Sequence, residues 1–186
     1  GYICEILHLN VHNYTSIDLC TDTPFDVSRA LHRLYRNKGI ATILNGKRII
    51  NRDEDRPEIS RTLSGSLNKD KYQTIYVKQR NAIRDKSAGV SLKTYDKLAE
   101  IRNASEKEYI LDYYNNPTKL YRTEVHLNNA EIKEYLQSHN LNLNPYMMDN
   151  AVLESMFFDY LNRVIRFQDG KEQITWEQLL GGRIAS

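Results

Sequence analysis

Cysteine is scarce in this sequence, and long apolar runs are missing. The 186 residues contain only two cysteines, Cys4 and Cys20, which is too few for a disulfide framework, and no CxxC pair suggests a zinc site. We therefore expect a reducing, cytoplasmic location. No apolar run is long enough to span a bilayer, and no signal-peptide pattern is present, so we expect no association with a membrane.

A strong excess of one charge is also missing. The chain has 26 Lys and Arg against 24 Asp and Glu, a net charge of +2, so any binding of nucleic acid must depend on local basic surface. The composition, 40% hydrophobic and 27% charged, is that of a polar globular protein, and the length suits a single domain over residues 1–186. Because the chain starts at Gly1 and not at Met, we expect a processed or excised piece of a longer protein.

Alternating hydrophobicity predicts several strands along the chain. The predicted strands cover residues 3–11, 15–21, 40–44, 48–50, 72–78, 90–96 and 120–127. A hairpin turn is predicted at Asn45-Gly46. Residues 51–71 and 79–88 are polar and aperiodic, and we expect basic loops there.

Helical periodicity and capping residues predict the remaining elements. Thr23 is the expected N-cap of a helix over 24–38, Ser105 and Glu108 form an expected capping box, and Asn129 is the expected cap of another helix. The longest helix is predicted over 151–165, and a short one begins at Ile174. The predicted fold class is α+β: a central, mainly antiparallel sheet with helices 24–38 and 150–165 on one face and an active site on the other. The motif-bearing part spans about 15–130, and a C-terminal helical part spans 146–186.

Residues 90–100 carry the first chemical feature, a strand that runs into a polar turn and a short helix. Alternation puts Tyr95 between Lys93 and Lys97 on the face opposite the apolar one. Ammonium groups stabilise a phenolate and attract phosphate, so we expect these lysines to lower the pKa of Tyr95 or to bind phosphate. The alternative is a surface tyrosine on a basic edge strand.

Glu124 and His126 carry the second feature, because they share one face of a strand on either side of an inward-facing valine. With Asp18 from a neighbouring strand, and Asp22 as an outer carboxylate, they make a set of oxygen and imidazole ligands that suits Mg²⁺ or Mn²⁺ better than structural Zn²⁺. The alternative is an exposed strand face on which Glu124 pairs with Arg122 or a lysine.

Three segments in order resemble a known family. They are residues 15–22 (TSIDLCTD), 91–100 (SLKTYDKLAE) and 121–127 (YRTEVHL). They resemble the rolling-circle replication initiators of small plasmids and the gene II-type replication proteins of phage, of the broad HUH endonuclease class. That family has an Arg-x-Asp strand, a Tyr-Asp/Asn-Lys-x-x-Glu strand end and an Arg-x-Glu strand. Here Ser16 stands where the family usually has Arg, His126 stands where a second acidic residue is common, and the His-hydrophobic-His strand is not present as such.

The resemblance implies a divalent-metal-dependent endonuclease. In that class a tyrosine attacks a DNA phosphodiester, stays joined to the 5′ phosphate and leaves a 3′ hydroxyl. Tyr95 matches the family's tyrosine, Glu124 its carboxylate and Asp18 its early aspartate. The implied partners are single-stranded or origin DNA and a host helicase. We expect the DNA backbone to be held by basic residues: Arg61, Lys69, Lys71, Arg80, Arg84 and Arg122. Tyr72, Tyr76 or Tyr121 are the candidates for stacking on unpaired bases.

Other interpretations stay open. Tyr109 and Tyr113 form an i, i+4 pair, and another group of phage initiators uses two helical tyrosines at that spacing, although Ile110 and Tyr114 beside them favour ordinary amphipathic packing. The chain is alternatively a non-catalytic module for single-stranded DNA or RNA, a hydrolytic nuclease that activates water, a relaxase that serves conjugative transfer, or an interaction domain with a solvated sheet face.

Overall fold

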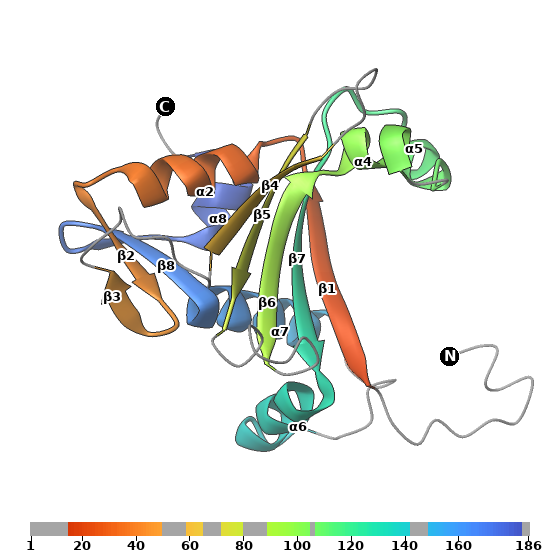
Figure 1. Ribbon diagram of the computed structural model, residues 1–186. Helices are drawn as coiled ribbons and strands as arrows, with labels where there is room; N and C mark the ends of the chain where they lie inside the picture. Colours follow the sequence, from red (N-terminus) through yellow and green to blue (C-terminus); the bar gives the residue numbers. More distant parts are fainter. Residues whose placement is uncertain are drawn as a thin grey trace, which may run out of the picture.

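The computed structural model describes residues 15–49, 59–64, 72–79, 89–104, 107–141 and 149–183. Within these ranges two antiparallel sheets pack with helices around one main core (Figure 1). The predicted α+β class with a mainly antiparallel sheet is therefore confirmed. The predicted strand at 3–11 and the basic residues Lys69, Lys71, Arg80 and Arg84 lie outside the described residues.

The larger sheet has five strands in the order β1-β7-β6-β5-β4. Their bounds are β4 Ile59–Ser64, β5 Tyr72–Lys78, β6 Val90–Asp96, β7 Tyr121–Asn128 and β1 Ser16–Thr23. Strands β4 to β7 follow one another up and down, and β1, from the start of the chain, pairs with β7 at one edge. The three motif strands β1, β7 and β6 are thus adjacent in a single sheet, as predicted.

The inner face of this sheet is apolar. Val125 and Leu127 of β7 and Val90 and Leu92 of β6 are completely buried. Helices α2 (Val27–Arg36) and α7 (Asn150–Val164) both contact this face, and their buried side chains belong to the same cluster. The prediction that these two helices cover one face is confirmed. Alternation of apolar and polar residues along each strand is the cause, since successive side chains point to opposite faces.

A second, four-stranded sheet was not predicted. Its order is β3-β2-β8-β9, with bounds β2 Ile40–Leu44, β3 Lys47–Ile49, β8 Ile165–Asp169 and β9 Glu172–Ile174. The expected hairpin forms, and Asn45 and Gly46 have φ values of 49° and 77°, as a type I′ turn requires. However, this hairpin joins β8 rather than the central sheet.

The C-terminal region was predicted to be helical, and that prediction is partly wrong. Helix α7 is followed at once by the β8–β9 hairpin, and the last helix, α8 (Trp176–Leu180), begins two residues later than expected. Thr175 and Gln178 form its capping box. The indole Nε1 of Trp176 donates to the Ile165 carbonyl at 3.2 Å, which attaches α8 to β8.

Several predicted helix ends also shift. Thr23 ends β1 and accepts the Phe25 N–H, so Asp26 caps α2 instead, with 2.9 Å between Oδ1 and the Arg29 nitrogen. Asn128 rather than Asn129 caps α6 (Asn129–Ser138). In α5 (Tyr109–Tyr113) Glu108 makes no side-chain cap, and Ser105 lies outside the described residues. The loop predicted over 51–71 contains β4, which pairs with β5 along its whole length.

Helix α4 (Lys97–Ala104) and α5 lie at one end of the five-stranded sheet, and α6 lies at the other (Figure 1). A small second core of Leu98, Ile101, Ile110 and Leu120 joins α4 and α5 to the start of β7. In the described ranges no helix is long and apolar enough to cross a membrane.

We predict that Leu161→Ala lowers the free energy of unfolding by about 2–5 kcal/mol, because Leu161 is completely buried and its loss leaves a cavity. Urea denaturation measures this change. Leu153→Ala on the same helix is the matched control, since Leu153 is only half-buried. Equal losses in the two variants would contradict the inward orientation of α7.

Candidate functional site

The outer face of the five-stranded sheet carries polar side chains from adjacent strands in register. Asp18 of β1 lies opposite His126 of β7, Cys20 opposite Glu124, and Asp22 opposite Arg122. On the other side of β7, Glu124 lies opposite Lys93 of β6, and Arg122 opposite Tyr95. The prediction that these polar residues share one face is confirmed.

Tyr95 and Glu124 form the central contact of this face. The Tyr95 hydroxyl donates to Glu124 Oε2 at 3.1 Å, across the β6–β7 pair. Only 3% of Tyr95 is exposed, and its neighbour Thr74 on β5 is buried to the same extent. The Nζ atom of Lys93 lies 4.1 Å from the centre of the Tyr95 ring, which is a cation–π contact. Tyr95 is therefore a fixed, buried residue and not a surface tyrosine on an edge strand.

The expectation that lysines lower the pKa of Tyr95 is wrong for this arrangement. Burial raises the pKa of the phenol, and the negative charge of Glu124 raises it further, while Arg122 opposes the shift. The two lysines lie near the ring of Tyr95 and not near its hydroxyl. The Nζ atoms of Lys93 and Lys97 are 4.1 Å and 5.8 Å from the centre of the ring. Tyr95 is therefore a neutral phenol that donates its proton to a carboxylate in a hydrogen bond.

Lys97 belongs to α4, not to the strand. Its side chain is 3% exposed, and its Nζ pairs with Glu100 Oε2 at 2.6 Å. Strand β6 ends at Asp96 because the carboxylate of Asp96 accepts the Ala99 N–H at 2.8 Å and starts the helix. A buried ammonium next to the tyrosine ring is thus held by its own counterion.

Asp22 and Arg122 form a bidentate ion pair at the end of the face nearest α4 and α5. Arg122 Nε and Nη2 donate to the two Asp22 oxygens, each at 2.7 Å, and the Asp22 carboxylate is 3% exposed. Hydrogen bonding to Asp22 raises the pKa of Arg122. Burial and Asp22 together raise the pKa of Tyr114 to about 12. Asp22 is therefore committed to Arg122, which does not fit its predicted role as an outer metal ligand.

Asp18 and His126 form a second pair at the exposed end of the same face. Asp18 Oδ1 lies 2.7 Å from His126 Nδ1, and their side chains are 58% and 36% exposed. The exposed thiol of Cys20 lies between this pair and the Asp22–Arg122 pair on β1. The face thus has a buried end around Tyr95 and Asp22 and an open end around Asp18 and His126.

The predicted metal ligands lie on one face but do not converge. Asp18 contacts His126, whereas Glu124 contacts Tyr95. Across the residues that can be described, no group of three or more His, Cys, Asp or Glu side chains is arranged to hold a metal ion. In chemical type, two carboxylates and one imidazole still suit Mg²⁺ or Mn²⁺, so metal binding by Asp18, Glu124 and His126 stays a prediction.

The predicted DNA-binding residues separate in space. Arg61 of β4 is opposite Ile75, on the side covered by α2. Burial, and then the charges of Arg61 and Arg36, lower the pKa of His32 in that helix. Tyr121 also lies on the inner side, where burial and then Asp26 raise its pKa. Tyr76 stays on the outer face opposite Lys93. Arg61 and Tyr121 are therefore not part of the polar face, whereas Arg122 and Tyr76 are.

The tyrosines of α5 do not pack as expected. Ile110 is buried, but Tyr109 and Tyr113 are 67% and 79% exposed. The rings of Tyr113 and Tyr114 meet edge to face, with 4.9 Å between their centres. Cys20 and Tyr114 are additional residues at the polar face. Strand alternation puts Cys20 there, but the sequence has no signal for Tyr114, which directly follows α5, a helix that begins more than ten residues after β6.

No protein-family model, no curated protein sequence and no solved structure matches this chain. The resemblance of its three motif strands to replication initiators therefore stays a prediction.

We predict that Asp22→Asn lowers the free energy of unfolding by about 3 kcal/mol, because it leaves the Arg122 guanidinium largely buried without its counterion. Urea denaturation at neutral pH gives the value. Asp18→Asn, on the same strand face, is the matched control and should cost less than about 1 kcal/mol, since its pair is exposed. A larger loss in the control would show that the exposed pair stabilises the sheet.

Proposed function

We propose that the outer face of the five-stranded sheet nicks single-stranded DNA, with Tyr95 as the nucleophile, and that the protein initiates rolling-circle replication. The observation that carries the proposal is the hydrogen bond from the Tyr95 hydroxyl to Glu124 Oε2. A nucleophile hydroxyl that already donates to a carboxylate has a base in place to take its proton. The order of the three motif strands, which resembles that of the initiators, supports the same reaction.

The reaction needs a proton acceptor, a phosphate contact and a leaving group. As the Tyr95 oxygen forms a bond to phosphorus, its proton passes to Glu124, and the bond from phosphorus to the 3′ oxygen of the preceding nucleotide breaks. That oxygen takes up a proton and leaves as a 3′ hydroxyl, while the 5′ phosphate stays on Tyr95. Lys93, whose Nζ lies 4.1 Å from the centre of the tyrosine ring, is the candidate for the contact with the phosphate.

The proposal includes Mg²⁺ or Mn²⁺, which would be held by Glu124, Asp18 and His126. Such a cation supplies polarisation of the scissile phosphate and neutralises charge that develops on its oxygens. Asp18 and His126 lie at the open end of the face, so their present contact with each other can be exchanged for a cation without unfolding the sheet.

A second function, binding of single-stranded nucleic acid without cleavage, is favoured by the burial of Tyr95. A phenol with a raised pKa and 3% exposure reaches a phosphate only if neighbouring side chains move. The open end of the face, with Cys20, Asp18 and His126, is accessible without such a movement.

We predict that the wild-type protein forms a covalent adduct with single-stranded DNA in the presence of Mn²⁺ and that Tyr95→Phe forms none. The probe is a pool of random-sequence oligonucleotides labelled at the 3′ end, since the fragment attached to tyrosine carries that end. Denaturing gels detect the adduct. Tyr76→Phe, on the same face of the next strand, is the matched control and should keep it.

Two results contradict this assignment. An adduct that survives in Tyr95→Phe but is lost in Tyr109→Phe or Tyr113→Phe moves the nucleophile to α5. A wild-type protein that binds the pool without any adduct excludes nicking of that pool and leaves the binding function.

We predict that single-stranded DNA slows alkylation of Cys20, because this exposed thiol lies on the polar face, directly across from Glu124 on the neighbouring strand. The experiment uses Cys4→Ser as the background, so that Cys20 is the single thiol, and mass spectrometry follows the reaction with iodoacetamide. The control adds Cys20→Ser and Glu177→Cys, which places the single thiol at an exposed position of α8 and should show no protection. Unchanged alkylation of Cys20 with DNA bound would place the DNA elsewhere.

A further inference from the structure

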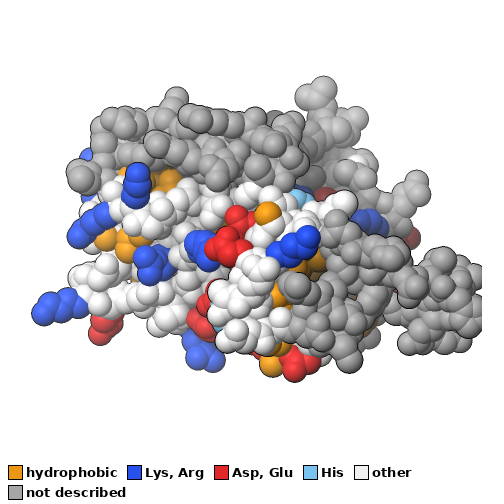
Figure 2. Space-filling model, turned by 90° about the horizontal axis from the view of Figure 1, so that it is seen from below, with side chains coloured by type: hydrophobic (Ala, Val, Ile, Leu, Met, Phe, Trp, Pro, Cys, Tyr) orange, Lys and Arg blue, Asp and Glu red, His pale blue; other side chains and the backbone are white. Residues whose placement is uncertain are grey.

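A separate cavity of about 670 Å³ lies at the other end of the molecule from α4. Its walls come from α6 and α7, the Asn45-Gly46 turn, the start of β8 and the end of β5. This volume is in the range of small-molecule sites. Figure 2 views the molecule from this end, and Lys and Arg side chains gather over the part that contains the second sheet, next to acidic ones near the centre.

One side of the cavity presents two planar groups in fixed positions, the imidazole ring of His139 and the guanidinium of Arg163. The His139 ring stacks on Tyr135, with 4.1 Å between ring centres, and the guanidinium of Arg163 lies 4.8 Å from the centre of the Tyr160 ring. Both groups are about half exposed, at 46% and 47%. Each has a flat surface backed by a buried tyrosine, so the outer surface is available for a third planar group.

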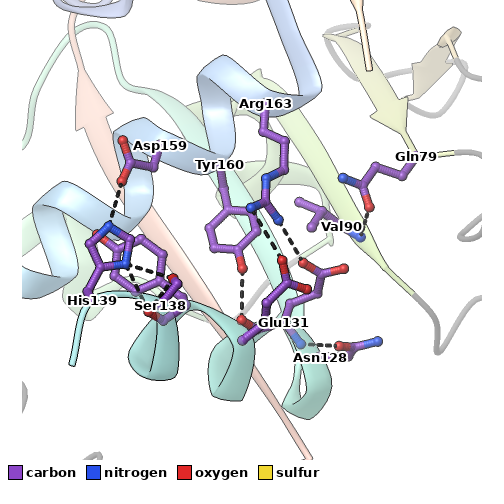
Figure 3. Close-up of polar contacts among 11 residues, drawn as sticks. Gln79, Val90, Asn128, Glu131, Ser138, His139, Asp159, Tyr160 and Arg163 are labelled. Atoms are coloured by element: carbon purple, nitrogen blue, oxygen red, sulfur yellow. Dashed lines mark hydrogen bonds and ion pairs between the residues drawn. The ribbon is translucent and has the colours of Figure 1, made fainter. Parts of the chain in front are cut away.

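Carboxylates hold these two groups in place. Arg163 pairs with Glu131 at 3.2 Å and with Glu134 at 3.6 Å, and His139 Nε2 lies 3.9 Å from Asp159 (Figure 3). The Tyr160 hydroxyl donates to the Glu131 carbonyl at 2.8 Å, which fixes the ring under Arg163. The stacking surfaces are therefore preorganised, and little conformational entropy is lost when a ligand binds.

The other side of the cavity is lined by Asn45 and Arg166, and each of these residues has a buried polar atom without a partner in the described part of the chain. Arg166 Nε of β8 and Asn45 Oδ1 of the turn are both buried and make no hydrogen bond with the described residues. Asn45 Nδ2 donates to the Lys78 carbonyl, which holds the amide in one orientation. Asn45 Oδ1 and Arg166 Nε have almost no exposed surface, so a ligand reaches them only when the side chains of Asn45 and Arg166 shift, and it then satisfies a donor and an acceptor that are costly to leave unpaired.

We propose that this cavity binds one nucleotide unit, with its base stacked on Arg163 or His139 and its phosphate at Arg166. A nucleobase supplies a flat ring with donors and acceptors at its edge, and the phosphate supplies the negative charge that a second arginine favours. Arg163 is neutralised by its carboxylates, whereas Arg166 makes no ion pair with the described residues. The unit comes either from a free nucleotide or from a single strand that lies along this end of the protein.

The test is isothermal titration calorimetry with adenosine 5′-monophosphate, adenosine and inorganic phosphate, and with a single-stranded oligo-dA. We expect the monophosphate to bind at least tenfold more tightly than adenosine or phosphate alone. Arg166→Gln should weaken the binding of the monophosphate about tenfold. The double variant His139→Ala, Arg163→Gln should weaken it to the same extent. Asn45→Gly keeps the positive φ of the turn and should weaken binding severalfold. Lys133→Ala, on the exposed side of α6, is the control and should leave it unchanged.

Each outcome decides the proposal. Binding of the monophosphate that depends on Arg166 supports a free nucleotide. Binding of the oligonucleotide alone, with the same dependence, supports a unit of a strand. Equal affinities for phosphate and the monophosphate, binding insensitive to all three sets of variants, or no binding at millimolar concentration would overturn it. Because Arg163 and His139 are on the surface, their variants keep the test valid if Arg166→Gln fails to fold. Tyr95→Phe should not change these affinities, which separates this result from the nicking reaction.

Discussion

The pairing of β7 with β6 on one side and β1 on the other is the constraint on which the rest of the structure depends. Because side chains alternate along a strand, this register buries Val125 and Leu127 against α2 and α7 and turns Glu124 and His126 to the opposite side. A shift by one residue would bring Glu124 and His126 into the core. The hydrophobic core and the polar face are therefore products of one arrangement, and neither can change without the other.

The polar face contains two environments that differ in how far their charged side chains are exposed to water. At the end near α4 and α5, Asp22 with Arg122 and Lys97 with Glu100 are buried pairs, in which each ion needs its partner because water is excluded. At the other end, Asp18 and His126 remain hydrated, and their contact can be exchanged at little cost. Tyr95 with Glu124 belongs to the buried end. A face of this kind combines a rigid region that fixes a phenol with an exposed region whose contacts can change.

The sequence predicts which residues share a face far better than it predicts which residues touch. The alternation at Val90–Asp96 and Tyr121–Asn128 gave the correct faces for Tyr95, Glu124 and His126. However, a shift of two residues keeps every face and changes every cross-strand partner, so pairs such as Asp22 with Arg122 could not be assigned. Residues on different elements, such as Tyr114 beside Asp22, depend on helix packing that no local pattern encodes.

Strand β8 of the second sheet and strand β4 of the five-stranded sheet were not predicted, for a different reason. Strand β8 begins at the residue that follows α7, without the glycine or proline that usually separates a helix from a strand. Strand β4 contains Arg61 and Thr62, whose polarity resembles that of a loop, and its place is fixed by pairing with β5. In both cases tertiary pairing decided a structure for which local propensity was weak.

The pairing of β1 with β7 also has a consequence for the time at which the polar face is completed. The ion pair of Asp22 with Arg122 joins positions 100 residues apart, and the contact of Asp18 with His126 joins positions 108 apart. At a synthesis rate of about 5–20 residues per second, β1 leaves the ribosome roughly 5–20 seconds before its partner. Contacts between such distant positions also form slowly, because a long loop must close first. During that interval β4, β5 and β6 can pair in sequence, whereas the aspartates of β1 stay in water, so a nascent chain reaches its folded sheet only after the arginine and histidine of β7 have been added.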